Sequence, residues 1–147
     1  MAKFEIDGLD DLEKMIKELG KLPQKCVTQS AKDGAKIALA SAKVKAPKDT
    51  GDLRKGIIIK GEKKTVSGKK VYDVMMDPAM NDVFVKVTKE GKRYYYPASQ
   101  EFGFITKKGK KTEGHHFLRD ALVDNKVQIE AKVIEKLSQL IDKEMGR

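Results

Sequence analysis

Residues 46–56 read Ala46-Pro47-Lys48-Asp49-Thr50-Gly51-Asp52-Leu53-Arg54-Lys55-Gly56, and the pattern of the sequence changes across them. Before this stretch apolar residues recur at helical spacing, and after it they alternate as in strands. Pro47 ends the preceding helix, because its ring clashes with a helical conformation at Ala46. Asp49 or Thr50 can then accept backbone N–H groups of a new turn, and Gly51 gives that turn conformational latitude. The stretch therefore predicts a corner between a helix and a sheet.

Two helices are predicted before this corner. In residues 9–22 the apolar side chains recur on one helical face, at Leu9, Leu12, Ile16 and Leu19. Residues 24–45 form the second helix, and its small side chains fall close to one stripe: Ala31, Gly34, Ala35, Ala38 and Ala42. Small side chains let another backbone approach closely, whether it belongs to the same subunit or to a neighbour. A short strand is predicted at residues 4–6.

The residues after the corner predict a sheet and a long final helix. Strands are expected at residues 57–62, 70–76, 83–88 and 93–96, in an antiparallel meander. Residues 117–145 follow the helical period, with an apolar stripe wider than a small sheet needs on one side. We expect an α+β fold, with an antiparallel sheet of about four strands packed with two N-terminal helices and a long C-terminal helix. With 147 residues, chain 1–147 fits a single domain.

The chain is strongly basic. It has 31 Lys and Arg against 22 Asp and Glu, for a net charge of +9. This balance permits binding to nucleic acid, but lysine-rich surfaces more often only keep a protein soluble. Residues 105–114 are predicted to form a flexible basic loop that orders against a partner or against phosphates; its lysines are Lys107, Lys108, Lys110 and Lys111.

A nucleic-acid-binding module is the alternative function. Besides the net charge, it would use the tyrosines of residues 94–96, which lie beside basic residues and could stack on bases. At strand spacing the same tyrosines also suit packing in a sheet or an interface, and we favour packing. The chain shows no recognised motif for reading nucleic acid, and its positive charge is spread along the sequence rather than gathered on one helix.

The sequence offers no set of residues for catalysis or for a cofactor. Glu101 lacks a partner acid, a base or a metal cage, so we expect it to be hydrogen-bonded or ion-paired. His115 and His116 are adjacent, and adjacent side chains point in different directions, which does not suit a metal site. Cys26 is the only cysteine, so an intrachain disulfide is excluded. We therefore expect no enzymatic activity, no metal and no cofactor.

Three stretches match, in order, the motifs of one known family. The first, 46–57, follows an alanine–proline–x–aspartate–threonine–glycine–x–leucine–arginine pattern through Pro47, Asp49, Thr50, Gly51, Leu53 and Arg54. The second follows a tyrosine and glutamate–aromatic–glycine motif through Tyr96, Glu101, Phe102 and Gly103. The third, 114–122, follows a phenylalanine–leucine–arginine–x–alanine–leucine motif through Phe117, Leu118 and Ala121. Together they resemble the small tail-component, or neck and tail-completion, proteins of long-tailed phages and prophages.

The resemblance implies a structural virion protein that forms a ring at the phage head–tail junction, with no enzymatic activity. The motif residues would act through conformation: the first motif would set the corner, with Leu53 as its anchor and Arg54 paired with a carboxylate. Phe117 and Leu118 would dock the last helix. His116 departs from the family pattern, because many members have a proline at this place.

The resemblance also implies partners. They would be further copies of the chain in a homo-oligomeric ring, the adjacent connector or head-closure proteins, and the tail-terminator or tail-tube proteins. Non-specific contact with DNA is left open. No run approaches the ~20 apolar residues that span a bilayer, and residues 1–22 lack an apolar signal core. We therefore expect no membrane contact. The resemblance implies synthesis in the cytoplasm of the bacterial host and a final location in the virion neck or tail.

Overall fold

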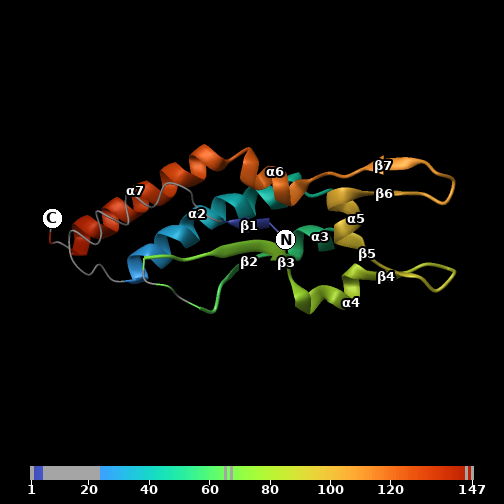
Figure 1. Cartoon of the computed structure of the whole chain (residues 1–147), viewed down its shortest axis with the longest axis horizontal. Helices are drawn as coiled ribbons and strands as arrows, with labels where there is room; N and C mark the ends of the chain where they lie inside the picture. The colour runs from blue at the N-terminus through green and yellow to red at the C-terminus, as the bar shows by residue number, and fades with distance from the viewer. Residues whose placement is uncertain (1, 5–23, 65, 67, 145, 147) are drawn as a thin grey trace.

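A single long helix, α2 (Gln24–Lys45), lies at the centre of the protein (Figure 1). The computed structural model describes residues 2–4, 24–64, 66, 68–144 and 146. One side of α2 packs on a three-stranded sheet of β1 (Ala2–Phe4), β2 (Ile57–Gly61) and β3 (Tyr72–Met76). The other side packs on α6 (Phe117–Val123) and α7 (Lys126–Glu144). The body therefore has three layers, with α2 as the middle one.

The small side chains of α2 serve packing inside the subunit. All five residues of the predicted stripe, Ala31, Gly34, Ala35, Ala38 and Ala42, are buried. The alanines among them belong to the core cluster together with Tyr72 and Val74 of β3 and with Phe117 and Ala121 of α6. Small residues allow α2 to approach both the sheet and the outer helices closely. Of the two partners that the sequence left open for this stripe, the structure places the one from the same subunit against it.

The three-stranded sheet is antiparallel, with β3 between β1 and β2. On β3 the buried residues Tyr72, Val74 and Met76 alternate with half-buried residues, as expected for a strand with one face on a core. Ile57 pairs with Met76 in the register of β2 and β3, so both contribute to the core face. The α+β class, the antiparallel pairing and the strands predicted at 57–62 and 70–76 are confirmed.

The predicted four-stranded meander is instead divided among small sheets. β4 (Val85–Val87) pairs only with β5 (Arg93–Tyr95) among the described strands, and β6 (Gly103–Ile105) pairs with β7 (Lys111–Glu113). A 3₁₀ turn, η1 (Pro78–Met80), and a short helix, α4 (Asn81–Phe84), separate β3 from β4. The start of the strand predicted at 83–88 was therefore wrong.

The interruption before β4 has a local cause and a long-range one. The Asp77 carboxylate accepts the backbone N–H of Ala79 at 2.9 Å, and Pro78 occupies the first helical position, where it is favoured. Phe84 is fully buried and belongs to the core cluster. The turn thus delivers a large core side chain from a helical position rather than from a strand.

The long C-terminal helix predicted at 117–145 is present as two helices with a break at residues 124–125. The Asn125 side-chain amide donates to the Ser41 hydroxyl on α2 at 2.8 Å and to the Ala121 carbonyl at 2.9 Å. Asp124 accepts a hydrogen bond from Lys45 of α2 at 2.7 Å. Asp and Asn side chains compete with the helical backbone for hydrogen bonds. The helix therefore breaks at Asp124 and Asn125, whose side chains bond to α2.

Residues 105–114, expected to form a loop, contribute most of a β-hairpin. β6 and β7 pair in register from Gly103 opposite Glu113 to Ile105 opposite Lys111. Within the turn, Thr106 accepts the backbone N–H of Lys110 through its hydroxyl at 3.1 Å. The predicted helix at 9–22 lies outside the described residues, as do residues 5 and 6 of the first predicted strand; β1 ends at Phe4.

Candidate functional site

The corner predicted at residues 46–56 is present, and Thr50 and Gly51 build it. Gly51 has a φ of +87° at the start of the short helix α3 (Asp52–Lys55), a conformation that side chains with a Cβ rarely adopt. The Thr50 hydroxyl accepts the backbone N–H of Asp52 at 3.3 Å and donates to the Asp52 carboxylate at 2.7 Å. Leu53 is buried and anchors α3 in the core cluster.

Arg54 forms hydrogen bonds with backbone carbonyls at the end of α2 and not with a carboxylate. Its guanidinium donates to the carbonyl of Ala46 at 3.2 Å and to that of Val44 at 3.4 Å. The last carbonyls of a helix have no donor within the helix and carry partial negative charge, so a cation is favourable there. The resemblance implied pairing with a carboxylate, and the structure corrects this to a backbone contact that ties the corner to the helix before it.

Glu101 connects the second motif to the third. It is only 5% exposed, at the end of α5 (Tyr96–Phe102). Its two carboxylate oxygens accept the backbone N–H groups of Leu118 at 2.9 Å and Arg119 at 3.1 Å, in the first turn of α6. These N–H groups have no partner within the helix, and a negative charge is favoured at this end. The hydrogen-bonded role predicted for Glu101 is therefore present, and it is a helix cap.

The backbone beside this cap is unusually close-packed. His115 and His116 donate their backbone N–H groups to the carbonyls of Gln100 at 2.7 Å and Glu101 at 3.1 Å. A Cβ at Gly103 would lie 2.2 Å from the Thr112 carbonyl oxygen, so no larger residue fits at the base of the β6–β7 hairpin. His116 has a φ of +49°, which the ring of a proline forbids. The family pattern has a proline where this chain has His116, and the backbone conformation at His116 is one that proline cannot adopt.

The three motifs meet at one end of α2. Figure 1 shows α3 of the first motif next to α5 of the second. Burial raises the pKa of Tyr96, and the negative charge of Asp49 raises it further. The cap by Glu101 joins the second to the third. Pro47 is half-buried at this end, whereas the buried apolar members of the motifs lie in the core cluster: Leu53, Phe117, Leu118 and Ala121.

An apolar groove of about 690 Å³ opens beside this meeting point. We define the apolar groove by its main apolar lining residues, which come from β3, η1, α5 and α6: Met75, Met76, Pro78, Phe102, Leu122 and Val123. Phe102 is 70% exposed although it belongs to the second motif. Glu101 also lines the groove, but both of its oxygens already accept backbone N–H groups. The groove therefore suits contact with another apolar surface rather than acid–base chemistry.

Sequence reasoning missed most of the groove. The sequence places Met75 and Met76 in the strand predicted at 70–76 and leaves Pro78 outside it, because nothing in their local pattern shows what these side chains face. It also missed the reason for Gly56, where a Cβ would lie 2.3 Å from the Phe84 ring. An aromatic residue placed 28 positions later in the chain imposes this requirement. Only the exposed position of Phe102 in an otherwise buried motif could have pointed to the site, and exposure requires the fold.

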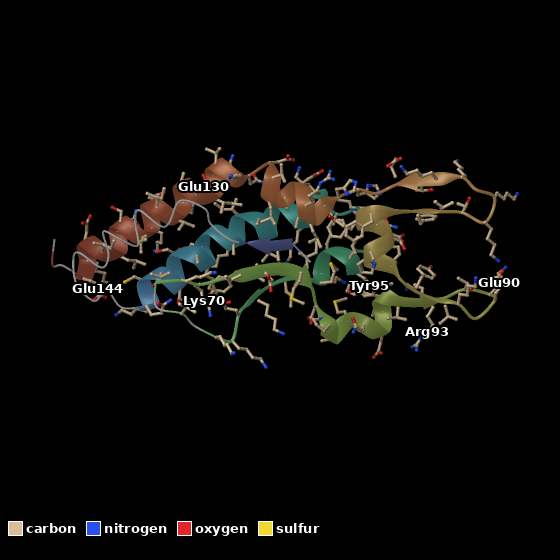
Figure 2. All side chains as sticks on the ribbon, viewed as in Figure 1. Lys70, Glu90, Arg93, Tyr95, Glu130 and Glu144 are labelled. Carbon is tan, nitrogen blue, oxygen red and sulfur yellow. The ribbon has the colours of Figure 1, made fainter. Side chains whose placement is uncertain are left out.

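Two basic hairpins project from the same end of the body (Figure 1). We call residues 85–95, with β4 and β5, and residues 103–113, with β6 and β7, the twin hairpins. Figure 2 shows Glu90 at the outer end of the first hairpin, Arg93 further in and Tyr95 near the body. Lys107 of the second hairpin forms an ion pair with Glu90 of the first. The predicted loop lysines are all exposed on the second hairpin: Lys107, Lys108, Lys110 and Lys111.

The described part of the chain holds no group of three or more His, Cys, Asp or Glu side chains that could bind a metal ion. Burial raises the pKa of the Cys26 thiol, which disfavours its reactive thiolate form. Within the same described ranges, no helix is long and apolar enough to cross a membrane.

Comparison with known protein families matches residues 10–103 to the family described as "Bacteriophage HK97-gp10, putative tail-component". The match covers nearly two thirds of the chain, and the chain belongs to this family. It includes the first two motifs and ends at Gly103, so most of the second hairpin, α6 and α7 lie beyond it. No curated protein and no solved structure matches the chain.

Proposed function

We propose that this chain forms a ring at the phage head–tail junction, as a structural neck or tail-completion protein. Its family consists of phage tail components, which gives the chain a structural role in the virion. The observation that carries the finer proposal is the apolar groove, which opens where the Glu101 cap meets α6. An open apolar surface of this kind in a structural protein is suited to contact with another subunit.

A ring of identical subunits requires two different surfaces on each chain, because each subunit contacts one neighbour with one surface and the other neighbour with the second. The apolar groove supplies one of them. The outer side of α7 supplies an apolar candidate for the other, since Val127 is 78% exposed and Ile134 is 56% exposed. The groove and α7 lie on different elements, so contact between them is heterologous and can close into a ring.

The motif residues divide into two roles in this proposal. Residues of the corner, of the Glu101 cap and of the core beneath them set the shape of the groove: Pro47, Thr50, Gly51, Leu53, Arg54, Glu101, Gly103, Phe117, Leu118 and Ala121. Phe102 contacts the neighbouring subunit directly. Asp49 and Tyr96 lie where the first two motifs come close to each other. The neighbouring rings would be the connector or head-closure proteins on one side and the tail-terminator or tail-tube proteins on the other.

The direct test is to locate the protein in purified particles. Mass spectrometry of virions from the phage or induced prophage should detect the chain at a stoichiometry of one ring per particle. Cryo-electron microscopy of the same particles should then place it between head and tail. Absence from purified virions would overturn the structural role, and a location along the tail tube or at its tip would overturn the head–tail assignment alone.

A further inference from the structure

The positive charge of this protein is concentrated on the twin hairpins. Their 22 residues hold eight basic and two acidic side chains, so they carry +6 of the net charge of +9. All eight basic side chains are exposed: Lys86, Lys89, Lys92, Arg93, Lys107, Lys108, Lys110 and Lys111. The two hairpins are separate in sequence, and the fold projects them together from one end of the body (Figure 1). Charge that is spread along the sequence, and not gathered on one helix, is therefore brought together by the fold.

Little of this charge is neutralised within the chain. Lys107 pairs with Glu90, and Lys111 pairs with Glu113 at 3.0 Å. The other six basic side chains of the twin hairpins form no ion pair with any described residue: Lys86, Lys89, Lys92, Arg93, Lys108 and Lys110. Ion pairs on the body contrast with this, since lysines of α7 pair with acidic residues of α7 or α2.

The twin hairpins gain no stability from this arrangement. Like charges gathered on thin two-stranded ribbons repel one another, and a two-stranded hairpin is only marginally stable alone. In a ring, several such arms would come near each other, and the repulsion would increase. A polyanion removes this cost, because its charges neutralise the lysines and its condensed counterions are released.

We propose that the twin hairpins bind the phosphate backbone of double-stranded DNA without sequence preference. The choice of DNA among polyanions rests on the proposed function, since the genome passes through the junction between head and tail. The unpaired cations are distributed over both hairpins and do not converge on one pocket. Such a distribution suits a continuous rod of phosphates better than a discrete acidic patch on a protein.

Salt-dependent binding tests this proposal on the purified full-length chain. The affinity for a random duplex of about 30 base pairs is measured by fluorescence anisotropy between about 50 and 200 mM salt. Six neutralised phosphates predict a slope of log affinity against log salt of about −5 per subunit. Replacing Lys89, Lys92, Lys108 and Lys110 with Gln should reduce the slope by about 4 and weaken binding at every salt concentration.

A matched control separates the twin hairpins from net charge. Replacing Lys55, Lys60, Lys63 and Lys64 with Gln removes the same charge from exposed positions on the body and should leave the slope unchanged. Equal losses in both variants would overturn the proposal in favour of diffuse surface charge. No DNA binding by the wild type at low salt would also overturn it. Neither outcome affects the proposed function, which depends on the presence of the chain in virions.

Discussion

The carboxylate of Glu101 accepts the backbone N–H of Leu118 at 2.9 Å, and this contact fixes the end of α5 to the beginning of α6. Both residues are buried and both line the apolar groove. The cap therefore determines how Phe102 and α6 are presented on the surface. Through this cap, the second and third motifs, which are separated along the chain, both shape the apolar groove.

Removing the Glu101 cap should destabilise the protein. Glu101→Ala leaves two backbone N–H groups at the start of α6 without their acceptor in a buried position, and we expect a loss of about 2 kcal/mol in the free energy of unfolding. Denaturant unfolding measures this value. The control is Glu135→Ala on the exposed side of α7, which should stay within about 0.5 kcal/mol of wild type. Equal stability of the two variants would show that the cap is not needed.

The positive φ of His116 predicts opposite effects for two substitutions. His116→Pro should lower the melting temperature, because proline cannot take a φ of +49° and cannot donate to the Glu101 carbonyl. His116→Gly should be neutral or stabilising by up to about 1 kcal/mol, because glycine adopts this conformation without strain. Thermal unfolding followed by circular dichroism compares them. A proline variant as stable as wild type would contradict the left-handed backbone at this position.

The Phe84 ring should be the reason why position 56 requires glycine. Gly56→Ala places a methyl group 2.3 Å from the Phe84 ring, which is fully buried and has little room to move. We expect Gly56→Ala to cost about 1–3 kcal/mol by overpacking. In a double-mutant cycle, Phe84→Leu should relieve most of this cost, which denaturant unfolding of the four proteins would reveal. Additive losses would mean that the two residues do not meet as described.

Phe102 should be required for assembly and dispensable for folding. Because its side chain is 70% exposed, Phe102→Asp should change the unfolding free energy by less than about 0.5 kcal/mol. A charge in the apolar groove should nevertheless exclude the subunit from virions, which immunoblotting of purified particles measures. Val66→Asp is the control, since Val66 is also exposed and lies outside the groove. Normal incorporation of the Phe102 variant would remove the groove from the subunit contact.

The link between the twin hairpins should be sensitive to acid. The hydrogen bond from Lys107 is the main cause that lowers the pKa of Glu90 below its ordinary value of 4.5, and Thr88 contributes next. A carboxyl group whose pKa is lowered in the folded state stabilises the folded state at pH values above the ordinary pKa of that group. This contribution is lost as the pH falls below 4.5 and through the lowered value. We therefore expect the hairpin tips to remain linked at neutral pH and to separate in acid.

An NMR titration of the Glu90 carboxyl group measures this effect. Lys107→Met should return the pKa of Glu90 toward 4.5, whereas Lys108→Met should leave it lowered. The same Glu90 pKa in the wild type and in the Lys107 variant would show that the two tips do not interact in solution.

Features with local causes were predictable from sequence. The end of α2 at Lys45 follows from Pro47, and the turn after it follows from Thr50 and Gly51. The strands β2 and β3 were predictable from their β-branched and alternating apolar residues, which the structure places with one face on the core. The helices α6 and α7 were also predictable, because apolar residues recur at helical spacing along residues 117–145 and this spacing marks the side of each helix that packs on the core.

Other features depended on residues far away in the sequence. The break between α6 and α7 is fixed by the hydrogen bond of Asn125 to Ser41, 84 positions away. Val83 and Phe84 fit a strand by pattern, yet the structure places them in α4 so that Phe84 reaches the core. Local preference was overruled in both cases by the stabilisation available from a distant partner.

The amino-acid sequence by itself determined the corner, the central helix, the α+β class and the family, because proline, glycine and apolar period act over a few residues. Only the tertiary structure decided what lies next to what. It brought the three motifs together at one end of α2, opened the apolar groove beside Phe102, and joined two basic hairpins through Glu90 and Lys107. Burial and charge density arise from packing segments distant in sequence, so they become visible only when the chain is folded.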